Sequence, residues 1–160
     1  MKTLLIALAL AAGLSAQNQT VTTYTASKQT SLTAAAEVVT VQQPATGARP
    51  VQFVAAYFDC SVACSMTLER NGTAASATSL SINPVFSGSV AATSTAFSSS
   101  NVGTGTVLSR FNCAAACSNT LDLTDISFQA GGTAQNLTLR SSSITGTVTI
   151  NFKFREVVSQ

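Results

Sequence analysis

Hydrophobic and polar residues alternate along much of the chain, and the alternation is clearest in residues 147–155. Successive side chains of a β-strand point to opposite faces, so a period of two indicates a strand with one buried face and one solvated face. We therefore expect the apolar set in the core and the polar set, which includes Lys153 and Arg155, in solvent. The apolar set is Val148, Ile150, Phe152 and Phe154.

Other segments also favour strands. Residues 38–41 and 51–58 are runs of β-branched and aromatic side chains of strand length, and we expect Tyr57 in the second run to pack inside. The dipeptide Asn71-Gly72 predicts a tight hairpin, because these residue types accept the positive φ that a type I′ turn requires. Residues 87–106, rich in Ser, Thr, Ala and Gly, predict a long surface loop or a weak edge strand.

The pattern as a whole predicts one fold class. No segment after residue 16 has a convincing helical period, and turn signals recur between the apolar runs. This combination predicts an all-β fold, an antiparallel β-sandwich that is jelly-roll-like and has about eight to ten strands. Residues 17–160 contain no linker long enough to divide them, so we expect a single β-sandwich domain.

The first sixteen residues differ from the rest and read as a signal peptide. Lys2 supplies a positive start, residues 4–14 are apolar, and Ser15-Ala16 is a small-residue cleavage site. The apolar run is shorter than the ~20 residues that a membrane-spanning helix needs, so we expect no membrane span. We expect a secreted protein, extracellular or at the cell surface.

The most specific feature is a motif that occurs twice. Residues 58–68 read Phe-Asp-Cys-Ser-Val-Ala-Cys-Ser-Met-Thr-Leu, and residues 111–121 read Phe-Asn-Cys-Ala-Ala-Ala-Cys-Ser-Asn-Thr-Leu, at a constant offset of 53 positions. Three small residues between two strands predict a short hairpin loop that sets the flanking cysteines opposite each other. We therefore expect two local disulfides, Cys60–Cys64 and Cys113–Cys117.

Other chemistry for the same cysteines stays open. Four cysteines allow three pairings, and a bridge across some 50 residues would stabilise by about 4 kcal/mol against about 2 kcal/mol for a five-residue ring in the loop-entropy model. The spacing also falls in the range of zinc ligands. An exported chain meets an oxidising compartment, and the sequence has no histidine, so we favour disulfides over a metal site. A redox role would more commonly use C-x-x-C.

Charge is scarce and nearly balanced. Only 9% of the residues are charged, and removal of Lys2 with the signal leaves 7 basic against 6 acidic residues, a net charge of +1. This balance gives no electrostatic reason to expect nucleic acid as a partner. Weak repulsion between copies favours self-association, so we expect a homo-oligomer or another extracellular protein as partner.

Few residues suit catalysis, and we predict no enzyme, no cofactor and no metal. With no histidine, a nucleophilic serine lacks its usual base. Glu69 and Asp122 occupy equivalent positions of the repeated motif and could approach each other as a carboxylate pair, and Asp122 with Asp125 could bind calcium weakly. We expect instead that the acidic residues are solvated at turns and strand edges.

The sequence therefore favours a non-catalytic structural or adhesive protein that self-associates. The first alternative is an extracellular binding module for a glycan or a protein. The second is an extracellular enzyme that uses a pair of carboxylates.

Overall fold

The computed structural model describes residues 19–71, 73–74, 78–99, 102–103, 105–131 and 133–159, so the predicted signal peptide lies outside the described residues. Within these ranges the chain forms fourteen β-strands and no helix. The strands are β1 (Gln19–Ala35), β2 (Val38–Gln43), β3 (Val51–Cys60), β4 (Cys64–Arg70), β5 (Thr73–Ala74), β6 (Thr78–Leu80), β7 (Ile82–Pro84), β8 (Thr95–Ser99), β9 (Val102–Gly103), β10 (Thr106–Cys113), β11 (Cys117–Asp122), β12 (Ser127–Phe128), β13 (Gln135–Ser141) and β14 (Ile144–Ser159).

The strands form two antiparallel sheets, which confirms the predicted β-sandwich. The first sheet has the order β11-β3-β14-β1-β7, with β12 also paired to β3, and the second has the order β10-β4-β13-β2-β8-β6. Strands β5 and β9 pair separately. The structure has more strands than the predicted eight to ten because several continuous segments bend and form two strands, one in each sheet.

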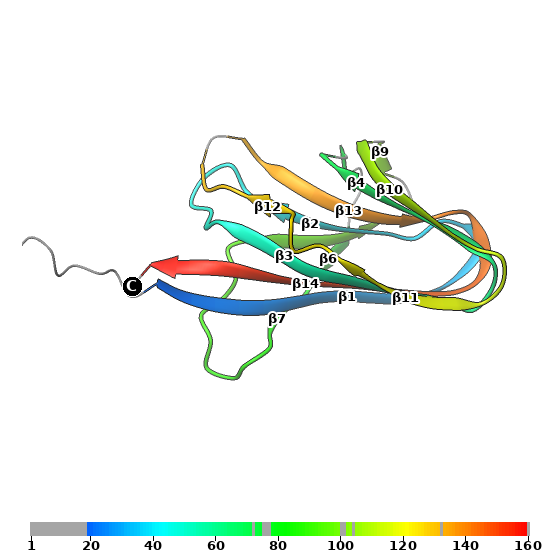
Figure 1. Cartoon of the computed structure of the whole chain (residues 1–160), viewed down its shortest axis with the longest axis horizontal. Helices are drawn as coiled ribbons and strands as arrows, with labels where there is room; N and C mark the ends of the chain where they lie inside the picture. Colours follow the sequence, from blue (N-terminus) through cyan, green and yellow to red (C-terminus); the bar gives the residue numbers. More distant parts are fainter. Residues whose placement is uncertain are drawn as a thin grey trace, which may run out of the picture.

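The two sheets are halves of one larger sheet that is folded over. Strand β3 lies between β11 and β14 in the first sheet, and its continuation β4 lies between β10 and β13 in the second. Strands β1 and β2 continue each other in the same way beside β14 and β13. We call the line where these strands change sheet the fold line; it crosses residues 36–37, 61–63, 114–116 and 142–143. Figure 1 shows the strands turning over along this line at one end of the molecule.

Serine hydroxyl groups hold the fold line together. Where the backbone bends sharply, the regular ladder is interrupted, and some N–H groups need other acceptors. The backbone N–H of Glu37 donates to Oγ of Ser141 over 2.9 Å, that of Ser65 to Oγ of Ser142 over 2.9 Å, and that of Thr147 to Oγ of Ser61 over 2.8 Å. The packing is tight, since a Cβ at Gly146 would lie 2.8 Å from Oγ of Ser61.

Aromatic side chains fill the space between the sheets. The predicted alternation along β14 is confirmed: the four apolar side chains are fully buried, and Lys153 and Arg155 are exposed. Phe53 is central, because its ring lies 5.2 Å from that of Phe128 and 6.0 Å from that of Phe152 between centroids. Contacts of this kind add specific geometry to the burial of apolar area.

The expectation that Tyr57 packs inside is wrong, and a β-bulge explains the error. The register between β3 and β14 shifts between Phe53 and Ala55, which leaves Val54 as an extra residue. A one-residue shift exchanges the two faces of a strand. Residues 56 and 58 are therefore buried, and Tyr57 is 39% exposed.

Two further expectations need correction. Strands β4 and β5 flank Asn71, which has a positive φ of 57°, but they pair with β10 and β9 and not with each other, so the Asn-Gly hairpin is wrong. Residues 87–106 are more regular than expected, because β8 pairs with β2 on one side and with β6 on the other.

Candidate functional site

The two cysteine motifs are corners of the folded sheet and not hairpins. Sγ atoms lie at disulfide distance within each motif, with Cα atoms 6.5 Å apart for Cys60 and Cys64 and 6.1 Å apart for Cys113 and Cys117. The flanking strands belong to different sheets, so the predicted hairpin geometry is wrong although the cysteines are close. In each motif, the two cysteines lie on either side of the turn that connects a strand of one sheet to a strand of the other. We call residues 60–64 the inner corner and residues 113–117 the outer corner.

The two corners run antiparallel and lie side by side. Cys60 is the ladder partner of Cys117, and Cys64 is the ladder partner of Cys113. Ser65 Oγ also donates a hydrogen bond of 2.7 Å to Oδ1 of Asn112 between the two motifs. The repeated sequence thus reflects a local two-fold relation between neighbouring strands.

This arrangement gathers the sulfur atoms. Those of Cys64, Cys113 and Cys117 lie within 4.8 Å of one another, and no other group of three or more potential metal-ligating side chains was found in the described ranges. A metal bound by cysteines needs thiolate ligands, and sulfur atoms joined in disulfides do not supply them. Peptide mapping without reduction tests the local pairing against the crossed pairing and the metal site.

The expectation of solvated acidic residues is wrong for Glu69. Its side chain is 1% exposed and forms an ion pair with Arg140 on the neighbouring strand β13. Its Oε2 atom also accepts a hydrogen bond of 3.1 Å from the backbone N–H of Gly105. A buried carboxylate requires such partners, so the contacts of Glu69 are those of a residue that stabilises the fold.

Asp122, the equivalent residue in the second motif, is exposed. Its Oδ1 accepts hydrogen bonds from the backbone N–H and the hydroxyl of Thr124, over 3.0 Å and 2.8 Å, and the backbone hydrogen bond is the main cause that lowers the pKa of Asp122. Glu69 and Asp122 therefore have different partners and surroundings. Asp125 is also exposed.

Glu156 is the most deeply enclosed acidic residue, and its burial also contradicts the expectation. The side chain is 0% exposed and lies 3.5 Å from Nη1 of Arg49. Backbone N–H groups of Thr93 and Ser94 donate to its two oxygens over 2.8–3.1 Å, and the Thr93 hydroxyl donates over 3.2 Å. These contacts fix the chain just before β8. The alternation along β14 indicates this burial, because Glu156 is the next residue after Phe154 on the buried face.

Glu37 at the fold line is also buried, with 6% of its surface exposed. Burial raises the pKa of its carboxyl group, while Lys28 and a hydrogen bond from the backbone of Val38 oppose this rise. The expectation of exposed acidic residues depends on residue type alone, and Glu37, Glu69 and Glu156 are exceptions to it.

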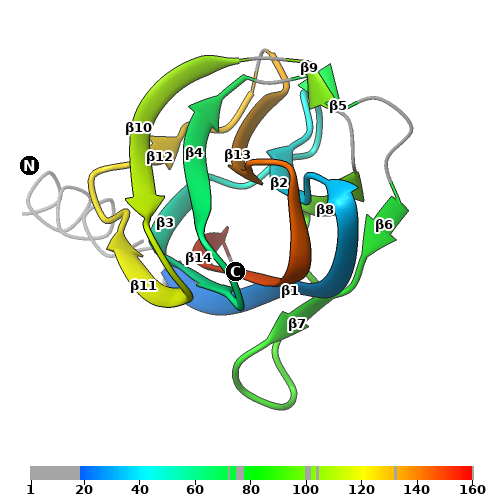
Figure 2. The same ribbon diagram turned by 90° about the vertical axis from the view of Figure 1, so that its right-hand side faces the viewer.

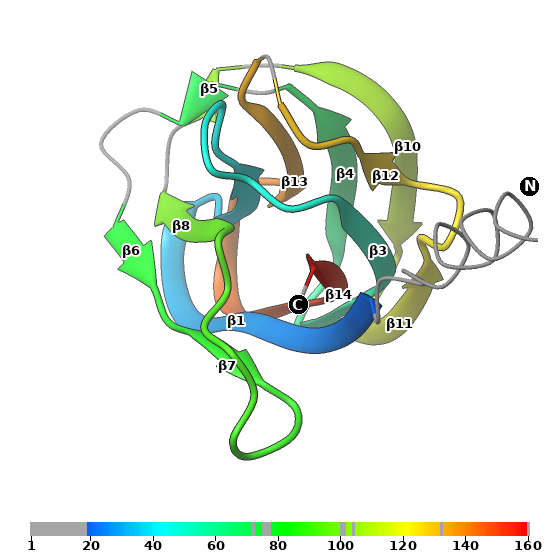
Figure 3. The ribbon, with the colours of Figure 1, turned by 90° about the vertical axis from the view of Figure 1, so that its left-hand side faces the viewer.

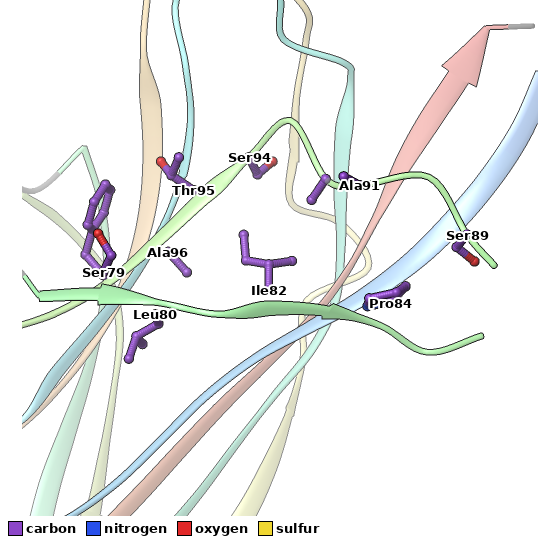
Figure 4. Close-up of a pocket in the computed structure, with 11 residues that line it drawn as sticks. Ser79, Leu80, Ile82, Pro84, Ser89, Ala91, Ser94, Thr95 and Ala96 are labelled. Carbon is purple, nitrogen blue, oxygen red and sulfur yellow. The ribbon is translucent and has the colours of Figure 1, made fainter. Parts of the chain in front are cut away.

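A pocket of about 440 Å³ lies between the β6–β7 segment and the chain leading into β8. Figure 4 shows Ile82 pointing from β7 into the space between these segments, with Ser94 on the opposite side. Leu80 and Ala96 also line it. Ser94 is only 5% exposed, and its Oγ has no hydrogen-bond partner in the described structure. An unpaired buried hydroxyl of this kind costs about 1–3 kcal/mol.

A hydrophobic loop adjoins this pocket. We use this name for residues 85–90, which connect β7 toward β8; Phe86 is 69% exposed, Val90 is 49% exposed and Val85 is 46% exposed. Figures 2 and 3 show the loop projecting away from the two sheets. Sequence reasoning did not single out this loop, because isolated apolar residues between Ser and Gly give no periodic signal.

The described residues form no helix long and apolar enough to cross a membrane. Comparison of the chain with protein-family models, curated proteins and solved structures gave no match. Functional inference therefore depends on the surfaces and contacts described above.

Proposed function

We propose that the chain is an extracellular, non-catalytic structural or adhesive protein that self-associates through one edge of its folded sheet. Two disulfide-distance cysteine pairs are compatible with an oxidising compartment, and the N-terminal sequence pattern favours export. The proposal depends chiefly on the edge formed by β10 and β11.

This edge runs along one sheet, bends at the outer corner and continues along the other sheet. Strand β10 ends the order of one sheet and β11 ends the order of the other, and none of the described strands pairs with their outer sides. Unpaired N–H and C=O groups along an edge can pair with a strand of another chain. We call residues 109–122 the free edge.

The free edge has few of the features that prevent edge pairing. Lys, Pro and β-bulges commonly protect exposed edges. The bulge in β10 lies at Leu108, before the free edge, and residues 109–122 contain no Lys or Pro and only two charged residues, Arg110 and Asp122. The low overall charge also supports close approach of two copies.

Light scattering during size-exclusion chromatography over a range of concentrations tests the proposal. We expect the average mass of the wild type to rise with concentration and Thr120→Lys, an exposed site on β11, to lower it. Gln52→Lys is the matched control, because this exposed residue lies on β3, which is paired on both sides. A wild type that stays monomeric at every concentration would contradict the proposal, as would equal effects of the two lysines.

A second candidate is a glycan-binding module, and the exposed ring of Tyr57 favours it. Aromatic rings with one exposed face can pack against sugars, and Tyr57 is 39% exposed on β3. Glycan-array binding that Tyr57→Ala abolishes and Gln52→Lys preserves would favour this module over the structural role.

A further inference from the structure

We propose that the pocket between β7 and β8 receives Phe86 from a second copy of the chain, so that two copies exchange hydrophobic loops in a closed dimer. The inference rests on the proposed self-association and adds a second surface on the opposite margin of the folded sheet. It follows from an exposed aromatic side chain and an uncharged pocket that lie together.

Phe86 is exposed on a loop whose backbone is hydrogen-bonded to β1 at both ends. The backbone N–H of Val85 donates to the carbonyl of Thr23 over 2.9 Å at one end of the loop. At the other end, the hydroxyl of Tyr24 donates to the carbonyl of Val90 over 2.6 Å. Gly88 makes the turn between them with a φ of 81°. Because both ends are fixed, association orders little additional chain, and preorganisation of this kind favours binding.

The pocket suits an aromatic side chain with an adjoining backbone. Its volume of about 440 Å³ lies within the usual range for ligand sites, and Leu80, Ile82 and Ala96 provide apolar contacts. Ser94 lines one wall of the pocket. Glu156 fixes the backbone N–H of Ser94, so this wall is already formed.

A second copy is the occupant that the structure favours. Pro84 and Ser89 line the pocket and also flank Phe86 along the chain, yet Phe86 is 69% exposed and does not line its own pocket. With the ring and the pocket side by side, a two-fold axis lets each copy insert its loop into the other. No charged residue lines the pocket or lies in residues 85–90, so the two faces do not repel each other.

Sedimentation velocity on the full chain with Thr120→Lys tests the loop exchange, because this background weakens pairing through the free edge. We expect a monomer–dimer equilibrium, and we expect Phe86→Ser to raise the dimer Kd on the order of 100-fold, since each dimer loses two central aromatic contacts. The melting temperature of the monomer should not change, because Phe86 is exposed. Tyr57→Ser is the matched control for loss of an exposed aromatic ring and should leave the Kd unchanged.

A complementation experiment tests the pocket itself. Ala91 is exposed and lines the pocket, so Ala91→Phe should occupy the pocket from its own chain and abolish the dimer. Phe86→Ser retains an open pocket and Ala91→Phe retains an intact loop. A mixture of the two should therefore form a heterodimer that neither variant forms with itself, measured by energy transfer between labelled chains.

The outcomes separate this inference from the proposed function. A Thr120→Lys chain that stays monomeric while the wild type associates would overturn the loop exchange and leave the free edge as the interface. A dimer whose Kd is unaffected by both Phe86→Ser and Ala91→Phe would also overturn it. Binding of an apolar fluorescent probe that Ala91→Phe abolishes, without any dependence of dimerisation on Phe86, would instead indicate a small-molecule pocket and contradict the proposal.

Discussion

The inner and outer corners have nearly the same sequence and different surroundings. Cys60 is 1% exposed and Cys64 is 5% exposed, whereas Cys113 and Cys117 are half-buried. The inner corner connects strands that have neighbours on both sides, and the outer corner connects strands that have a neighbour on one side only. The same motif is therefore part of the core in one place and part of the surface in the other.

Because of this difference, the two corners distinguish the stabilisation by a disulfide bond from the stabilisation by the side chains packed around it. Both corners close a ring of five residues, which corresponds to about 2 kcal/mol in the loop-entropy model for either disulfide. Any difference in their contribution to folding must come from the side chains around them. Equivalent substitutions in the two motifs measure that difference directly.

The largest difference is expected at the aromatic residue that begins each motif. Phe58 is fully buried and Phe111 is half-buried, with their ring centroids 6.2 Å apart. Phe58→Ala should lower the free energy of unfolding by about 3–5 kcal/mol and Phe111→Ala by about 1–2 kcal/mol. Urea denaturation measures both values. Equal losses would show that the outer corner is as well packed as the inner one.

The disulfides provide the next comparison. Non-reducing peptide mapping should first recover Cys60 joined to Cys64 and Cys113 joined to Cys117, with no peptide that links the motifs. Replacing the outer pair by serine should lower the free energy of unfolding by about 2 kcal/mol, and replacing the inner pair by about 3 kcal/mol, because two hydroxyls are then buried. Thermal and urea unfolding measure the order, and a larger loss at the outer pair would refute the importance of packing.

The acidic residues at the end of each motif give a smaller contrast. Glu69→Gln removes the charge that faces Arg140, whose side chain is 28% exposed and can regain part of its hydration. We expect a loss of about 1–3 kcal/mol in unfolding free energy. Asp122→Asn should change the unfolding midpoint little, because Asp122 is solvated. A large destabilisation by Asp122→Asn would instead indicate that Asp122 has a role beyond its hydrogen bonds to Thr124.

A corner without cysteines extends the comparison to pH. Glu37 lies on the fold line, and burial raises its folded pKa above the ordinary value of 4.5. The folded state then binds the proton more tightly, so this group lowers stability as the pH rises from 4.5 through the folded pKa. Glu37→Gln should raise the melting temperature slightly at pH 7, and the gain over the wild type should disappear below pH 4.5. Melting curves across this pH range measure the effect, and a constant difference at all pH values would contradict it.

Local alternation predicted much of the fold. The four apolar residues of β14 fall on the buried face because no irregularity interrupts their own alternation. The same rule failed at Tyr57, because one extra residue in β3 exchanges the faces and leaves no mark in the sequence. It would have predicted the burial of Glu156 had the pattern been extended by one residue beyond Arg155.

The corners show where sequence reasoning ends. A short spacing between two cysteines predicts that they are close both in a hairpin and in a sheet corner. The predicted proximity of the cysteines is therefore correct, but the predicted hairpin between the flanking strands is wrong. The pairing of β3 with β11 depends on contacts between segments about sixty residues apart, which no local pattern encodes. The same holds for the pocket, whose walls come from β6, β7 and the chain before β8.

The long pairing of β1 with β14 determines how the fold would respond to mechanical force. Gln19 lies opposite Ser159, and the ladder continues to Leu32 opposite Gly146. A pull on the chain at Gln19 and Ser159 would load the hydrogen bonds one after another, since both strand ends lie at the same end of the sheet and the bonds run across it. Such a ladder opens like a zipper at low force. Tension carried along a strand paired at the free edge would instead be shared by many bonds at once, so an assembly joined through its sides would resist stretching better than a chain of these domains joined end to end.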